Sequence, residues 1–211
     1  MVKRALIIAN GEPPKKSLLQ TLARESDFIV CADGGANTAL KFGIIPHAIV
    51  GDMDSIHAET LSKFRTVPQY ADTDQESTDL EKVVTWTIRE QYDHITVAAG
   101  LGKRMDHTVG NLGVMAKFYP DAVIRFVDDL GELSYVGSKT EFEAEIGSTV
   151  SLIPLNRCEG ITTAGLKYPL TNERLELGFR DGTSNEVISN PVLIVVKKGH
   201  LLLFRLHTGP H

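Results

Sequence analysis

Two aspartates, Asp52 and Asp54, follow a glycine directly after the apolar run 48–50. In an extended or turning segment, side chains two residues apart point the same way, so both carboxylates can converge on one point. A divalent cation would offset their repulsion, and Mg²⁺ takes oxygen ligands while keeping waters and substrate phosphates in its other positions. The alternative is a plain turn, because Asp and Gly are typical turn residues. The choice between a metal site and a plain turn depends on the rest of the sequence.

A second cluster, Asp33 with Gly34 and Gly35, joins a predicted strand to a predicted helix. Glycines let the backbone approach a ligand, and the free N–H groups at a helix start favour anions. A strand-to-helix turn would use the same residues, so both interpretations stay open.

The segment 74–84 opens a predicted helix. Thr78 suits the N-cap with Glu81 three residues later, and the helix dipole favours Asp79 in the first turn. Capping and packing leave three polar residues unexplained: Asp74, Gln75 and Lys82. Asp79 is therefore a candidate third metal ligand.

The segment 100–111 follows another predicted strand and enters another helix. Arg104 could contact a phosphate in bidentate fashion, and His107 and Asn111 share one helix face because they are four residues apart. A single His or Arg would more often be a surface residue, but the accompanying glycines favour a phosphate site. The chain has neither a Walker lysine motif nor a GxGxxG in its usual context.

In the last third, the segment 181–187 predicts a hairpin turn. Ser184 and Asn185 within it are also candidate ligand contacts.

Short apolar runs alternate with amphipathic stretches up to about residue 130, which is typical of an α/β domain with a mainly parallel sheet. The predicted strands are 5–9, 28–32, 48–50, 95–98 and 123–127. Ligands of such sheets bind at the carboxyl ends of the strands, so the polar clusters should line one edge.

After residue 130 the pattern changes to short β-type segments, which suggest a small antiparallel sandwich or barrel. These segments are 149–153, 175–179, 191–196 and 201–206. We therefore predict an α/β domain over 1–130 and a smaller all-β sandwich over 131–211.

The composition is that of an ordinary globular chain, with 211 residues, 42% hydrophobic and 23% charged residues and a formal net charge of −5. The negative charge argues against nucleic-acid binding through a basic surface. The first apolar run, 5–9, is too short for a signal peptide or a membrane span. Cys31 and Cys158 lie far apart, which suits a reducing compartment. We expect a cytoplasmic protein with no nucleic-acid or membrane partner.

Taken together, the clusters resemble the thiamine pyrophosphokinase family in order and spacing over nearly the whole chain. The matching segments are 33–37, 51–55, 74–79, 104–111 and 183–185. The resemblance implies an N-terminal ATP-binding catalytic domain, a C-terminal thiamine-binding sandwich and a homodimer with thiamine between its subunits. It also implies diphosphate transfer from ATP to thiamine with release of AMP.

The resemblance also implies residue roles. Asp52, Asp54 and Asp79 would bind Mg²⁺, and Gln75, with Asp74, would lie beside the substrate. Either Asp74 or Asp79 could orient the thiamine hydroxyl or accept its proton. The nucleotide-side residues would be Asp33, Gly34, Gly35, Asn37, Arg104, Asp106, His107 and Asn111.

Arg104 would also offset charge during the reaction, and Ser184 and Asn185 would contact thiamine. Some relatives place a tryptophan shortly after that last motif, whereas the single Trp of this chain is Trp86, within a predicted helix.

The residues alone leave two other functions open. A metal-dependent nucleotide-sugar transferase would use Asp52 and Asp54 but would leave the clusters at 74–79 and 104–111 unexplained. A non-catalytic nucleotide- or thiamine-sensing module could use the same scaffold.

Overall fold

The computed structural model describes residues 2–72, 74 and 76–207. The chain divides into two compact units, Met1–Asp129 and Leu130–His211. Each unit has its own hydrophobic core.

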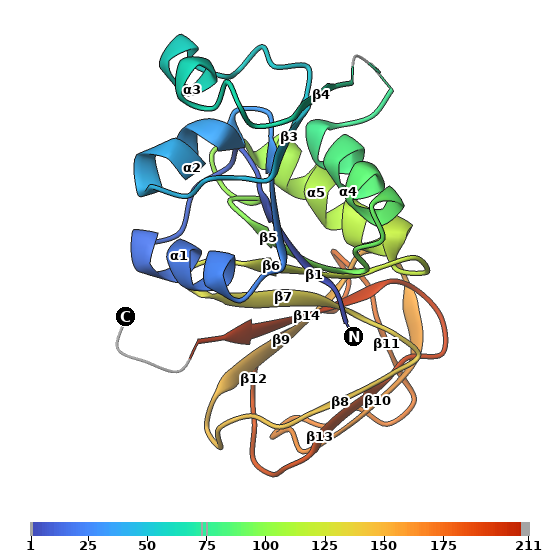
Figure 1. Cartoon of the computed structure of the whole chain (residues 1–211). Coiled ribbons are helices and arrows are strands. Elements are labelled where there is room, and N and C mark those ends of the chain that lie inside the picture. The colour runs from blue at the N-terminus through green and yellow to red at the C-terminus, as the bar shows by residue number, and fades with distance from the viewer. Residues whose placement is uncertain (1, 73, 75, 208–211) are drawn as a thin grey trace. The chain divides into compact units, whose positions relative to one another are not determined.

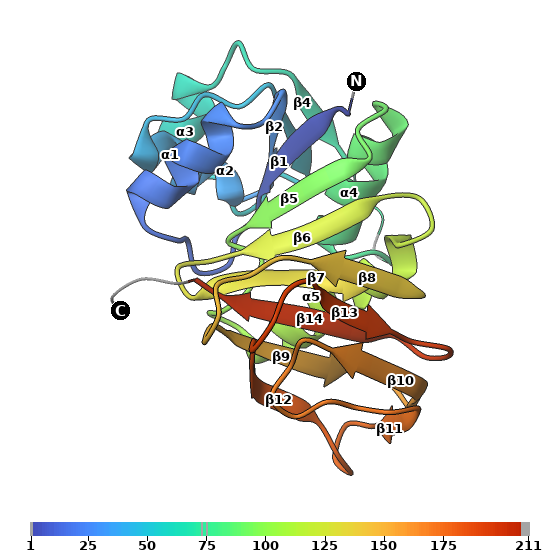
Figure 2. The same cartoon turned by 90° about the horizontal axis from the view of Figure 1, so that it is seen from below.

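The first unit is built on a parallel sheet with the strand order β6-β5-β1-β2-β3-β4. Its strands are β1 (Arg4–Ile8), β2 (Phe28–Ala32), β3 (Ala48–Gly51), β4 (Gln69–Ala71), β5 (His94–Ala98) and β6 (Val123–Val127). Figure 2 shows β1, β5 and β6 side by side. Residues 5–8 of β1 are fully buried, as expected for a central strand covered on both faces.

Helices cover both faces of this sheet: α1 and α2 lie on one side, and α4 and α5 lie on the other (Figure 1). The helices are α1 (Lys16–Arg24), α2 (Gly35–Phe42), α3 (Ala58–Lys63), α4 (Asp79–Arg89) and α5 (Met105–Phe118). Apolar stripes of helical period produce the packing. Leu19 and Leu22 of α1, for example, share a core with Leu6 and Ile29 of the strands. None of the described helices is long and apolar enough to cross a membrane.

The strand order places a topological switch between β1 and β5. The chain leaves β1 towards α1 on one face and leaves β5 towards α5 on the other. Such a switch opens a crevice at the carboxyl ends of the two strands, where ligands of open α/β sheets bind.

The described residues of the second unit form two antiparallel sheets, with the orders β12-β9-β14-β7 and β11-β10-β13-β8. The strands are β7 (Gly131–Val136), β8 (Lys139–Phe142), β9 (Thr149–Pro154), β10 (Cys158–Ala164), β11 (Glu173–Leu175), β12 (Gly182–Glu186), β13 (Val192–Val195) and β14 (Leu201–Leu206). Side chains from both sheets share one core, among them Leu152, Leu203, Ile161 and Ile194. The predicted fold class, an α/β domain followed by a smaller all-β sandwich, is confirmed.

Two predictions about local structure in this unit are wrong. The predicted strand 175–179 ends at Leu175, and the exposed residues Leu177 and Phe179 form a turn closed by hydrogen bonds between Glu176 and Arg180. The predicted hairpin turn 181–187 is instead strand β12, which pairs with β9. Its turn-type residues serve a register shift between Gly182 and Asn185, which is a common feature of edge strands.

Candidate functional site

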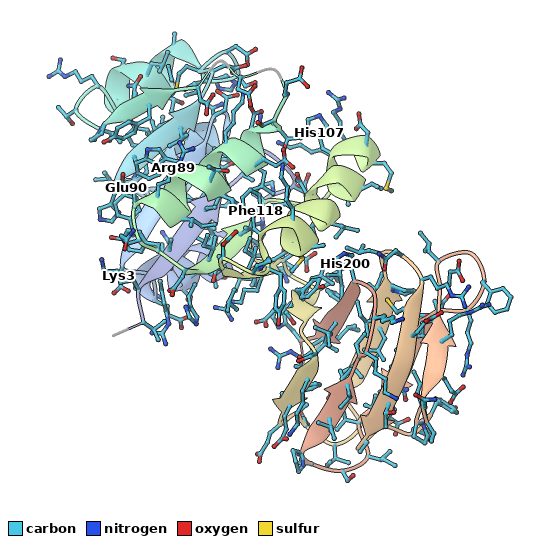
Figure 3. The ribbon with its side chains drawn as sticks, turned by 90° about the vertical axis from the view of Figure 1, so that its right-hand side faces the viewer. Lys3, Arg89, Glu90, His107, Phe118 and His200 are labelled. Atoms are coloured by element: carbon cyan, nitrogen blue, oxygen red, sulfur yellow. The ribbon has the colours of Figure 1, made fainter. Side chains whose placement is uncertain are left out.

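A cleft of about 300 Å³ lies at the carboxyl edge of the parallel sheet, at the switch between β1 and β5. Its lining comes from segments that are distant in the sequence: Asn10, Gly11, Ser55, Asp79, Arg104 and His107. His107 lies near the start of α5, whereas Phe118 ends that helix (Figure 3). The start of α5 therefore contributes to this edge, together with the start of α4.

Three carboxylates gather beside this cleft. Asp33, Asp52 and Asp54 each offer an oxygen, and these oxygens lie within 4.8 Å of one another. Asp33 is only 1% exposed, and within the described part of the chain its Oδ1 has no hydrogen-bond partner. Burial raises the pKa of Asp33, and the charges of Asp52 and Asp54 add to this rise, whereas the nearby Ser55 hydroxyl and the Gly34 N–H oppose it. An unpaired buried oxygen among converging carboxylates fits a divalent cation.

The backbone holds these carboxylates in a strained arrangement. Asp33 and Met53 have positive φ angles of 42° and 70°, which non-glycine residues adopt uncommonly. Gly51 has a φ of 148°, and a Cβ there would lie 2.9 Å from the Cβ of Asp33. Glycine at this position therefore leaves the space that Asp33 occupies.

Hydrogen bonds fix the loop that carries Asp52 and Asp54. The backbone N–H of Asp54 donates to Asp52 Oδ1 at 3.2 Å, and the Ser55 hydroxyl donates to Asp54 Oδ1 at 2.9 Å. The Asn37 amide anchors the loop to α2 by donating to the Ser55 carbonyl at 2.9 Å and accepting from the His57 N–H at 3.0 Å. Both ends of that amide are thus engaged in holding the loop.

We expect Gly51→Ala to lower the free energy of unfolding by about 1–3 kcal/mol, because it adds both a crowded Cβ and an unfavourable φ. Gly110→Ala is the matched control. A Cβ at Gly110, in the interior of α5, meets nothing within 4 Å, so this change should stabilise by about 0.5–1 kcal/mol. Urea unfolding of both variants measures the difference. Equal stability of Gly51→Ala and the parent chain would contradict the packing argument.

Asp79 is the first residue of α4 and lines the cleft. Its side chain is 46% exposed. Partial burial raises its pKa, and the charges of Asp33 and Asp52 raise it further, so Asp79 shares the electrostatic field of the carboxylate group. In the described residues, the set within 4.8 Å contains Asp33 rather than Asp79, so a metal-binding role for Asp79 stays a prediction.

Asp74 is exposed and makes local bonds. Its carboxylate accepts from the Glu76 N–H at 3.0 Å and from the Ser77 hydroxyl, and these bonds, the Ser77 bond foremost, lower its pKa. Gln75 lies outside the described residues.

The predicted capping box at the start of α4 is confirmed. The Thr78 side chain accepts from the Glu81 N–H, and the Glu81 side chain accepts from the Thr78 N–H.

The glycine-containing loop before α5 presents cations to the cleft. Arg104 is paired with Asp106 in bidentate fashion, with its Nη2 2.5 Å from Oδ2 and its Nε 3.1 Å from Oδ1. This pairing lowers the pKa of Asp106 to about 2. Asn111 fastens the loop by donating to the Gly100 carbonyl at 2.6 Å. The bidentate contact of Arg104 with a phosphate stays a prediction, because in this structure its guanidinium is paired with Asp106.

Lys103 is a cleft residue that the sequence analysis missed. Its ammonium donates to the Asn10 carbonyl at 3.1 Å, and its backbone has a φ of 56°. Its position next to Arg104 in a glycine-containing loop was the sequence signal that could have identified Lys103.

In the second unit, Asn185 holds Tyr168. Asn185 is 8% exposed, donates from Nδ2 to the Tyr168 carbonyl at 2.8 Å and accepts from the Tyr168 N–H at 3.1 Å. Tyr168 is 64% exposed, so an aromatic side chain is presented from the backbone that Asn185 holds. The φ of Ser184 is 57°, and its N–H donates to the Ser151 hydroxyl at 3.0 Å. Tyr168 was not among the residues predicted from the sequence. Trp86, the single tryptophan, packs against Phe28 and Tyr70 in the first unit.

A larger cleft of about 500 Å³ lies where β1, β5 and β6 begin, and Arg4, His94 and Arg125 help to line it. It lies at the amino ends of the parallel strands. The carboxyl edge carries the carboxylates, the glycine-containing loop and the helix starts, so we take that edge as the candidate site.

Comparisons with known proteins agree with these features. Residues 19–126 match the family model described as thiamin pyrophosphokinase, catalytic domain, and residues 139–201 match the one described as thiamin pyrophosphokinase, vitamin B1 binding domain. The chain is 30% identical over 213 residues to thiamin pyrophosphokinase 1 of Caenorhabditis elegans, covering 93% of this chain and 86% of that protein.

Bacterial relatives span the same length. The thiamine pyrophosphokinase of Bacillus subtilis is 28% identical over 214 residues, covering 97% of this chain and 99% of that protein. A crystal structure of thiamine pyrophosphokinase from Bacillus subtilis superposes with a TM-score of 0.84 at 27% identity, covering 98% of this chain and all of that one.

Proposed function

Because the chain belongs to the thiamine pyrophosphokinase family, we propose that it is an enzyme that transfers diphosphate from ATP to the hydroxyl of thiamine and releases AMP. The observation that carries this proposal is the group of Asp33, Asp52 and Asp54 at the carboxyl edge of the sheet. Such a group can hold a cation against a phosphate chain, and phosphoryl transfer depends mainly on positioning and on charge stabilisation.

Mg²⁺ is the proposed metal, with Asp52 and Asp54 as ligands and Asp79 as a third. The buried, unpaired Oδ1 of Asp33 supports adding Asp33 to this set. When bound, the ion would supply Lewis-acid chemistry that offsets the negative charge developing on the phosphate oxygens. Asp33 would act from a fixed position, because its backbone and surroundings leave it little freedom.

Nucleotide binding is assigned to the residues around the cleft. The glycines at 34 and 35 and the free N–H groups at the start of α5 can approach phosphate oxygens closely. Arg104 and Lys103 supply positive charge, and His107 and Asn111 lie on the same helix face. The Asp106 carboxylate holds the Arg104 fork ready, and a phosphate can compete for it because both side chains are exposed.

Asp79 is the better placed of the two carboxylates proposed to orient the thiamine hydroxyl or to accept its proton. It lines the cleft, and its raised pKa is that of a stronger base. Asp74 is engaged with Glu76 and Ser77, which lowers its pKa and makes it a weaker base.

Thiamine binding is assigned to the second unit, with Ser184 and Asn185 as contacts. Asn185 also fixes the backbone of Tyr168, whose exposed ring offers a stacking face for the heterocycles of thiamine, one of which is a cation. Tyr168 would then supply the aromatic surface that Trp86 is not placed to supply.

Tyr168→Ala should raise the KM for thiamine about five- to tenfold, the size expected for one aromatic stacking contact. The KM for ATP should change little. Tyr168→Phe is the control, since it keeps the ring and removes the hydroxyl. Steady-state kinetics with each substrate varied in turn would measure both constants, and equal changes in the two KM values for Tyr168→Ala would contradict a thiamine-side role.

The proposal further includes a homodimer with thiamine bound between subunits and a location in the cytoplasm. The buried, unpaired cysteines Cys31 and Cys158 suit a reducing compartment.

A coupled assay for AMP tests the function. Release of AMP that requires both thiamine and a divalent cation is the expected result. Release of UDP from a UDP-sugar would indicate a sugar transferase, and tight binding of ATP or thiamine without turnover would indicate a sensing module.

A further inference from the structure

Lys82 is an unusual residue for a helix interior. It lies in the first turns of α4 and is only 6% exposed, among the buried apolar residues Leu80, Val83 and Val84. Lysine is almost never buried unless its charge is paired, because removing an ammonium from water is costly. Helix packing alone would favour an apolar residue at this position.

The charge of Lys82 is paired with that of Asp79. Its Nζ lies 4.0 Å from Asp79 Oδ1, and in the described residues no hydrogen bond from the ammonium accompanies this ion pair. The Asp33 Oδ1 is the corresponding unpaired acceptor of the same unit. The charge of Asp33 raises the pKa of Asp79, and the charge of Lys82 lowers it. A buried lysine paired with Asp79 and a buried, unpaired carboxylate oxygen of Asp33 thus both act on Asp79, which lines the cleft.

We propose that Lys82 is a positioning residue that acts through Asp79: its fixed ammonium offsets part of the negative charge of the carboxylate group, so that the phosphate chain of a nucleotide can approach. This inference rests on the proposed function of the same site. Arg104 and Lys103 supply exposed positive charge on the opposite loop, whereas Lys82 supplies buried charge that solvent screens weakly.

This role predicts effects of opposite sign on two ligands. A positive charge beside the carboxylates repels a divalent cation and attracts a phosphate chain. Removing it should therefore strengthen binding of the free cation and weaken binding of the metal-free nucleotide. A residue that only supported the fold would weaken both.

Lys82→Met tests the inference, because methionine has a similar length and no charge. Binding is measured at pH 8 with two probes: Mn²⁺ alone, by electron paramagnetic resonance, and α,β-methylene-ATP in EDTA, by ligand-observed NMR. We expect Mn²⁺ to bind about three- to tenfold more tightly and the nucleotide analogue about three- to tenfold more weakly, the size expected when one nearby elementary charge is removed. The melting temperature should change little, because the partner Asp79 is 46% exposed and water can solvate its charge once Lys82 is removed.

Two control variants separate charge from packing. Lys117→Met removes an exposed lysine that pairs with Glu81 of α4 at 3.1 Å, and it should change both affinities less than twofold because solvent screens that charge. Val83→Ala removes fully buried apolar volume from α4 and should lower the melting temperature without separating the two affinities. Neither probe requires turnover, so a chain without thiamine diphosphotransferase activity would still give a result. Affinities that fall together, or that both stay within twofold of the parent chain, would overturn the inference.

Discussion

Replacing Asp52 or Asp54 by asparagine should lower kcat/KM at least about 30-fold, or about 2 kcal/mol in transition-state stabilisation, while the fold stays intact. Both side chains are exposed at the end of β3, so neither contributes a core contact. Each would supply one charge to the proposed metal site, and asparagine has a similar shape without that charge. Activity measured over a range of Mg²⁺ concentrations, together with thermal unfolding, would separate loss of chemistry from loss of structure.

Asp121→Asn is the matched control for these variants. Asp121 is exposed and lies just after α5, at the opposite end of that helix from His107. Its replacement should leave kcat/KM within twofold of the parent chain. Near-normal activity of Asp52→Asn and Asp54→Asn at saturating Mg²⁺, with unchanged melting temperatures, would remove both residues from the proposed metal site.

The sequence was sufficient to find the carboxylates and the sheet edge that carries them, because both depend on local patterns. Buried parallel strands appear as short apolar runs, and the polar residues after them must then lie at the same edge. The spacing of Asp52 and Asp54 predicted their convergence, and Thr78 and Glu81 predicted the start of α4. These are interactions between residues a few positions apart.

What the sequence could not predict depends on tertiary contacts. The buried, unpaired oxygen of Asp33 depends on the space left by Gly51, and the held backbone of Tyr168 depends on Asn185, which is 17 residues away in the sequence. The segment 181–187 has turn-type residues, yet pairing with β9 makes it a strand. The apolar residues Leu177 and Phe179 suggested a strand, but they lie exposed at a turn. For the segment 181–187, pairing with a distant strand thus outweighs the local propensity.

The choice of the bond that breaks in ATP gives the sharpest test of the reaction. We expect β-labelled and γ-labelled phosphate to enter thiamine diphosphate together, with one AMP released per product and no thiamine monophosphate intermediate. The sequence contains no Walker lysine motif, and the described residues that line the cleft form no Walker-type cradle of the kind that presents a γ-phosphate. Its charged groups, Asp79, Lys103 and Arg104, instead come from two separate segments of the chain.

A cation held by Asp33, Asp52 and Asp54, with Arg104 and Lys103 on the glycine-containing loop, would fix the phosphate chain at more than one point. The thiamine hydroxyl oxygen then forms a bond to the β-phosphorus while the bond from the β-phosphorus to the α,β-bridging oxygen breaks, and that oxygen leaves as part of AMP. The hydroxyl proton passes to a base such as Asp79. A rapid-quench experiment with both labels would follow the first turnover. Equal incorporation of the two labels with stoichiometric AMP is the expected result, whereas ADP and singly phosphorylated thiamine as first products would show that geometry presents the γ-phosphorus instead.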